Sequence, residues 1–232
     1  MNKALRTLAR TALLATLFVL ATYLALTIQP YVSSSTTFNQ TLGSESPLII
    51  GGYGLYVNPT AIITDAVLIA TAYLVLARGK PRVSLTKYSL GIIAVYAILS
   101  TTLYLVIATE PAQARTSMPT NLDGIATFTA SIIIGSVTPL VYAREKRWKV
   151  GSDWRSFLFT LYASIIAGSL IIDTTTALTL LTIPRLAPAC IGSVTIGAYG
   201  PIDGLITAPL LGLLAGYIVL DPIRTDGFAC SI

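Results

Sequence analysis

The stretch Ser156–Thr182, SFLFTLYASIIAGSLIIDTTTALTLLT, decides how this chain folds. Asp173 is the only charged residue in it, and the other polar side chains are small hydroxyls or a tyrosine. An α-helix needs about 20 mainly apolar residues to cross a bilayer, and this run is longer than that. The stretch is therefore typical of a membrane-spanning helix.

The composition of the whole chain points the same way. The 232 residues are 54% hydrophobic and 11% charged, and the mean hydropathy is +0.76. Soluble domains carry about 25% charged residues, which cover their surface. We therefore predict an all-α integral membrane protein.

Five further apolar segments bring the prediction to a bundle of six transmembrane helices in a single polytopic domain, residues 1–232. The expected helices cover about residues 8–30, 59–77, 88–108, 122–143, 156–182 and 202–220. Asn58 and Pro59 read as the N-cap and first residue of the second helix. The first apolar run is longer than that of a signal peptide, which favours an uncleaved anchor.

The basic residues indicate how these helices are threaded. All but two of the 15 lysines and arginines, Arg115 and Arg185, lie before the first helix, in the second-to-third and fourth-to-fifth connections, or after the sixth helix. Positively charged loops stay on the cytoplasmic side. We therefore predict a multi-pass cell-membrane protein with both termini in the cytoplasm. Attraction to anionic membrane lipid accounts for the pI near 9.3, so no nucleic-acid partner is predicted.

Two outer connections share a signature. Ile50–Gly54 is IGGYG and Ile196–Gly200 is IGAYG, and the helices that follow end in the similar runs Tyr73–Leu76 and Tyr217–Leu220. A duplicated hairpin would give a parallel repeat, related by an axis along the membrane normal. Coincidence in a chain rich in Gly, Tyr and Leu is the alternative.

The second of these connections, residues 192–204 (GSVTIGAYGPIDG), resembles the TVGYG-type filter of potassium channels. An extra alanine separates Gly197 from Tyr199, so successive carbonyls would not fall at the filter spacing. We predict a glycine-rich outer connection instead, and leave open whether it re-enters the membrane.

Enzymatic chemistry is not expected. The chain has no histidine and 2 cysteines, which removes the usual ligands of haem, zinc and copper and the usual general base. We predict no cofactor and no metal centre. An intramembrane hydrolase is the weakest alternative, because neither Asp173 nor Asp203 stands in the GxGD context of presenilin-like and prepilin-type peptidases.

Asp65 and Asp173 are the candidate binding residues. Asp65 lies two turns inside its helix, roughly 9 Å from Pro59, and Asp173 is followed by Thr174 and Thr175. Charged groups within a bilayer are costly and mark functional sites. We expect both carboxylates at comparable depth, forming with the hydroxyls a pocket for a cation or polar solute. The alternative is a polar cluster that locks two helices together.

Small residues at four-residue spacing predict where helices approach closely. They are Ala208, Gly212 and Gly216 in the sixth helix, Ser131 and Gly135 in the fourth, and Ser164 and Gly168 in the fifth.

The function we expect is that of a transport component that binds a small cation or polar solute from the outer side, with partner membrane subunits or an ATPase. In size and threading the chain is similar to the membrane-embedded substrate-binding subunits of energy-coupling transporters, and that resemblance carries no residue across. The alternative is a non-catalytic subunit of a larger membrane assembly, such as a secretion, DNA-transfer or respiratory complex.

Overall fold

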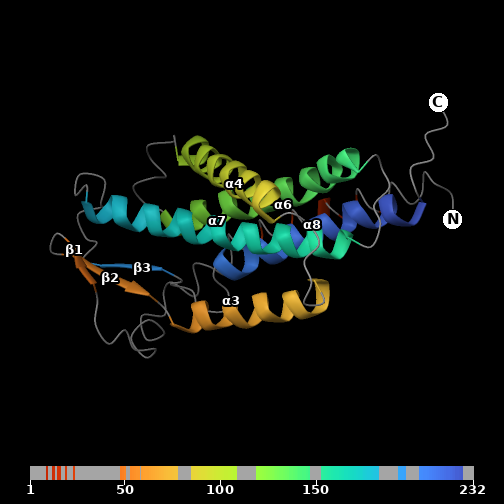
Figure 1. Cartoon of the computed structure of the whole chain (residues 1–232). Coiled ribbons are helices and arrows are strands. Elements are labelled where there is room, and N and C mark those ends of the chain that lie inside the picture. Colours follow the sequence, from red (N-terminus) through yellow and green to blue (C-terminus); the bar gives the residue numbers. More distant parts are fainter. Residues whose placement is uncertain are drawn as a thin grey trace.

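The structure is a computed structural model of the whole chain (Figure 1). It describes residues 48–50, 53–57, 59–77, 85–108, 119–146, 153–182, 193–196 and 204–226, together with single residues between 9 and 23. Most of the predicted first helix, 8–30, and of the connection after it therefore lies outside the described residues.

Helices make up nearly all of the described chain, which confirms the helical class. They are α3 (Pro59–Ala72), continued directly by the π-helix η1 (Tyr73–Ala77), α4 (Leu85–Ala108), α6 (Pro119–Glu145), α7 (Trp154–Thr182) and α8 (Gly204–Asp226). α3 begins at Pro59, whose fixed φ suits the first helical position. α8 continues through Pro222, six residues beyond the predicted end at 220.

Four of these helices form a bundle. α6 packs along α8, α4 along α7, α7 against α8, and α4 against α6, while α3 lies on the side of the bundle formed by α7 and α8. The chain reverses direction from each helix to the next, so that α3, α6 and α8 run one way and α4 and α7 the other (Figure 1).

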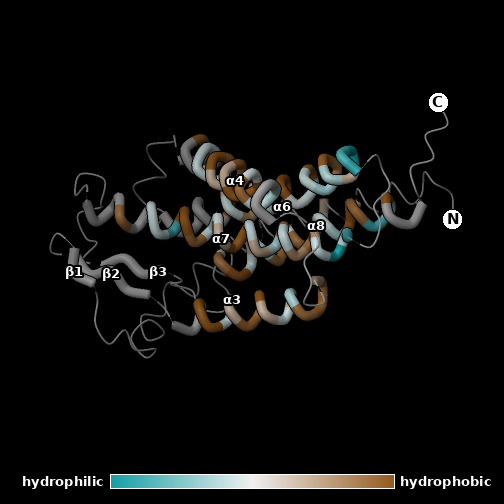
Figure 2. The backbone as a smooth tube through the Cα atoms, in the orientation of Figure 1, coloured by the Kyte–Doolittle hydropathy of each residue, from teal (hydrophilic) through white to brown (hydrophobic). Residues whose placement is uncertain are grey.

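Several polar side chains are buried inside the bundle, whereas many apolar side chains are exposed. Asp65, Ser131 and Ser164 are buried among the helices, whereas Leu74 is 69% exposed and Ile98 is 67% exposed. Apolar residues run the length of the helices (Figure 2). This distribution suits an outer surface that meets lipid, where close packing replaces the hydrophobic effect between helices.

Among the residues that the structure describes, three helical stretches are long and apolar enough to cross a membrane. They are Ile125–Glu145, Trp154–Thr175 and Gly204–Ile223. Two shorter apolar stretches cover Ala61–Ala77 and Tyr88–Leu103. The structure therefore fits the expected membrane protein.

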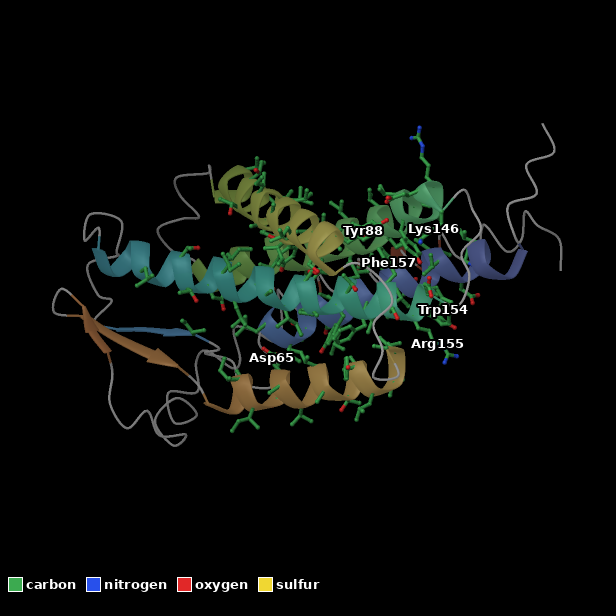
Figure 3. The ribbon with its side chains drawn as sticks, viewed as in Figure 1. Asp65, Tyr88, Lys146, Trp154, Arg155 and Phe157 are labelled. Atoms are coloured by element: carbon green, nitrogen blue, oxygen red, sulfur yellow. The ribbon has the colours of Figure 1, made fainter. Side chains whose placement is uncertain are left out.

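A small sheet lies at the end of the bundle where α3 and α8 begin (Figure 1). We call this the sheet end, and the opposite end, which carries Lys146 and Arg155, the basic end (Figure 3). The strand order is β1 (Leu48–Ile50), β2 (Tyr53–Val57), β3 (Ser193–Ile196), with β1 antiparallel and β3 parallel to β2. The sequence shows no alternating pattern that predicts these strands, which are a small addition to the helical fold.

The sheet does not align the two glycine-rich signatures. Pairing places Gly54 opposite Ser193 and Val57 opposite Ile196. Gly54 is thus the last residue of one signature and the second of β2, whereas Ile196 begins the other and ends β3. Residues 197–200 lie outside the described part of the chain.

Candidate functional site

Asp65 projects from α3 toward the other helices (Figure 3). Only 3% of the residue is exposed, and Ala61, one turn earlier, is fully buried on the same side of the helix. The neighbours Ile62, Ile63 and Val67 face outward. α3 therefore directs one carboxylate inward, while most of its exposed side chains are apolar.

Tyr162 on α7 lies close enough to Asp65 for the two side chains to interact electrostatically. Tyr162 is 1% exposed, and within the described part of the chain its Oη has no hydrogen-bond partner. Burying a hydroxyl without a hydrogen bond costs about 1–3 kcal/mol. Asp65 on α3 and Tyr162 on α7 are thus both shielded from solvent.

Polar groups continue along the same face of α7. Tyr162, Ser169 and Asp173 are spaced seven and four residues apart, which places them in one stripe along the helix. Ser169 Oγ and the Oη of Tyr96, from α4, lie 3.0 Å apart in a buried hydrogen bond. Asp173, nearer the sheet end, is half-buried. The stripe therefore leads from a partly exposed carboxylate to the buried Tyr162.

Gly168 allows this hydrogen bond to form. A Cβ at position 168 would stand 2.6 Å from Cδ1 of Tyr96, closer than packed side chains come. The absence of a side chain lets the tyrosine ring lie directly on the α7 backbone.

Aromatic rings join α3–η1 to α7. The rings of Tyr73 and Phe159 pack at 5.5 Å where η1 meets α7. Asp65 is buried on α3, and Asp173 is half-buried on α7. That the two carboxylates lie at comparable depth stays a prediction.

The two threonines after Asp173 lie on the outer surface of α7. Thr174 and Thr175 are exposed, and Thr175 Oγ1 donates to the carbonyl of Ile171 at 2.7 Å. Neither joins Tyr162 and Asp65 on the inward face.

The small residues that we expected at helix contacts are all buried: Ser131, Gly135, Ser164, Gly168, Ala208, Gly212 and Gly216. Two of them, Gly135 and Gly212, meet directly. A Cβ at Gly135 would stand 2.9 Å from the carbonyl carbon of Gly212 and closer still to its oxygen. A Cβ at Gly216 would stand 2.6 Å from Leu161 Cδ2. These contacts seat α8 between α6 and α7 and so hold the frame around Asp65.

Aromatic side chains close the basic end (Figure 3). Tyr142 and Phe157 stack at 4.2 Å, and the Tyr88 ring meets each of them edge-on at 5.9 Å. The Tyr88 hydroxyl donates to the Glu145 carboxylate. Their sequence positions, far apart in the chain, gave no signal for this cluster, which ties α4, α6 and α7 together.

α7 begins beside this cluster. The amide of Phe157 donates to the carbonyl of Asp153 at 3.0 Å, which makes Asp153 the N-cap. The Arg155 guanidinium lies 5.2 Å from the centre of the Trp154 ring. A tryptophan and an arginine at a helix end are typical of a membrane–water interface.

Tyr162 is the site residue that sequence reasoning did not select. A tyrosine inside a long apolar run is usually a packing residue. Only the spacing of Tyr162 from Ser169 and Asp173, which places the three on one face of the helix, indicates another role. Among the residues that the structure describes, no three Cys, Asp or Glu side chains cluster as metal ligands would. Comparison of the chain with models of known protein families, with curated proteins and with solved structures finds no match.

Proposed function

We propose that this protein spans the cell membrane six times, with both termini in the cytoplasm, and binds a small cation or polar solute from the outer side as part of a transport system. The observation that carries this proposal is the burial of the Asp65 carboxylate beside Tyr162, inside a bundle with an apolar exterior.

A buried carboxylate such as that of Asp65 is not expected to stabilise the folded protein. Transferring a charge from water to a low-dielectric interior costs several kcal/mol, and apolar replacements of buried charged groups are often neutral or stabilising. Ionisable residues at membrane depth are accordingly rare, and they mark pathways for ions and solutes. A ligand that binds this carboxylate would give Asp65 a function that an apolar residue cannot supply.

The ligand would arrive from the sheet end. Lys146 and Arg155 lie at the basic end, which the positive-inside rule assigns to the cytoplasm. The sheet end is then the outer end, and the half-buried Asp173 is nearer to it than Tyr162 is. The polar stripe on α7 supports a route from Asp173 past Ser169 to Asp65.

A ligand panel on the purified full chain in mild detergent tests this proposal. Chlorides of sodium, potassium, ammonium, magnesium and calcium, and neutral amino acids and sugars, are each added while the thermal unfolding midpoint is followed. At least one should raise the midpoint of the wild type, since a ligand of the folded state stabilises it.

Asp65→Asn should abolish that rise while the variant still elutes as a folded protein. Asp221→Asn, a matched change on α8 near the basic end, should keep it. A panel with no stabilising compound, or an Asp65→Asn variant that responds like the wild type, would end the proposal.

A further inference from the structure

We infer that the basic end binds one anionic phospholipid, with its phosphate on Arg155 and an acyl chain along the outside of α8. This inference goes beyond the proposed function. It needs a membrane around the bundle, which is part of that proposal, but it depends neither on Asp65 nor on transport. Successive side-chain contacts carry it, because they lead from an exposed apolar stripe to a basic side chain.

The apolar stripe runs along α8 toward the basic end. Leu210, Leu214 and Tyr217 are spaced four and three residues apart, which places them on one face of the helix, and all three are exposed. At a rise of about 1.5 Å per residue, the stripe is about 10 Å long. Exposed apolar side chains of a membrane helix meet lipid, so this stripe offers a surface for an acyl chain.

Trp154 joins the stripe to Arg155. The rings of Tyr217 and Trp154 lie 6.2 Å apart, and the Arg155 guanidinium lies 5.2 Å from the centre of the Trp154 ring. Tyrosine and tryptophan side chains favour the level of the lipid headgroups, where both the apolar ring and its polar edge are accommodated. A lipid whose chain lies on the stripe would therefore have its phosphate at the level of Arg155.

The charge of Arg155 selects an anionic headgroup. Arg155 is half-exposed and projects away from the bundle (Figure 3). Within the described part of the chain its guanidinium contacts the Trp154 ring and forms no ion pair, whereas Asp153 and Asp221 have interaction partners of their own. A guanidinium binds two phosphate oxygens at once. In an anionic phospholipid, no headgroup ammonium competes for that phosphate or is repelled by the arginine.

Fluorescence quenching of Trp154 tests the inference. The chain has 2 tryptophans, so Trp148→Phe leaves Trp154 as the single fluorescent indole. This full-length protein is reconstituted into phosphatidylcholine vesicles in which a fixed fraction of the lipid, either phosphatidylglycerol or phosphatidylcholine, carries bromine on its acyl chains. Bromine quenches an indole that it contacts. Brominated phosphatidylglycerol should bind beside Trp154 about fivefold more tightly than brominated phosphatidylcholine, the effect expected of one basic residue at a membrane surface.

Arg155→Gln, made in this single-tryptophan protein, removes the charge and keeps a polar side chain. It should abolish the preference while both brominated lipids still quench. Arg144→Gln is the matched control, because Arg144 is exposed at the end of α6 and its loss lowers the charge of the basic end equally. This control should keep the fivefold preference. If Arg155→Gln does not yield folded protein, Arg155→Lys replaces it: lysine keeps the charge but cannot bind two phosphate oxygens side by side, so the preference should fall at least twofold.

The outcomes separate this inference from the proposed function. Equal binding of the two lipids before Arg155 is changed, or an unchanged preference in Arg155→Gln or Arg155→Lys, would overturn the inference alone. An equal loss of preference in Arg144→Gln would also overturn it, because the charge of the whole end, and not Arg155, would then attract the lipid. If neither brominated lipid quenches Trp154, the basic end does not meet lipid, and the proposed membrane placement fails together with the inference.

Discussion

Gly135 of α6 and Gly212 of α8 touch backbone to backbone, with only 3.0 Å between the Cα of Gly212 and the place where a Cβ of Gly135 would stand. On its other side, Gly212 faces the side chain of Ile165 from α7. Three helices therefore converge at one glycine. Among the described glycines, Gly135 is the one whose added Cβ would come closest to another atom, and the contact lies beside α7, which carries Tyr162.

Gly135→Ala should consequently destabilise the protein. The added methyl would collide with the Gly212 carbonyl, which is backbone and cannot rotate away, and such overpacking costs about 1–3 kcal/mol. Gly91→Ala is the matched control, because nothing lies within 4 Å of a Cβ there, and alanine should stabilise α4 by up to about 1 kcal/mol. Unfolding free energies in detergent should separate the two variants. Equal stability would contradict the close contact.

The buried hydrogen bond between Tyr96 and Ser169 should appear as an interaction energy. Tyr96→Phe and Ser169→Ala should each lower the free energy of unfolding by about 1 kcal/mol. The double variant should lose less than the sum, with a coupling of about 0.6 kcal/mol, as is common for hydrogen bonds between membrane helices. Strict additivity would mean that the two hydroxyls are not bonded.

Asp173→Asn should weaken ligand binding by less than tenfold, and so by much less than Asp65→Asn. Asp173 is half-buried whereas Asp65 is buried, so the charge of Asp173 acts through a more polar medium. Thr175→Val should leave affinity unchanged, because the Thr175 hydroxyl already bonds its own helix at Ile171. Isothermal titration of each purified variant with the stabilising ligand measures both. Complete loss of binding in Asp173→Asn would shift the main ligand role to Asp173.

Lys146→Cys should test the orientation. In a variant with Cys190 and Cys230 replaced by serine, a membrane-impermeant maleimide should label position 146 only after cells are permeabilised, since positively charged connections stay inside. Gln40→Cys, in the predicted outer connection, should be labelled in intact cells. The reverse pattern would invert the threading and place the sheet end in the cytoplasm.

Long apolar runs and helix-start signals made the helices predictable. The run at 156–182 needs a helix because a membrane offers no water to satisfy backbone groups, and α7 covers Trp154–Thr182. The close contact at Gly135 and Gly212 was predictable from small residues spaced four positions apart, because helices that pack closely in lipid need small side chains at the contact.

The way in which α3 and η1 pack on α7 was not predictable, because it depends on residues far apart in the chain. The contact of Tyr73 with Phe159 is part of that packing, and no local pattern encodes it. The sheet escaped prediction for the same reason. Gly54 pairs with Ser193 across most of the chain, and short strands stabilised by such distant partners leave little trace in sequence.

The sheet connects the start of α3 to the rest of the bundle. Val57 is the last residue of β2 and Pro59 the first of α3, while β3, paired with β2, packs through Ile196 against Leu170 and Leu205. The start of the helix that carries Asp65 is thus tied through the strand pairing to α7 and α8. A change in how β2 and β3 pair would therefore alter how α3 is anchored on the bundle.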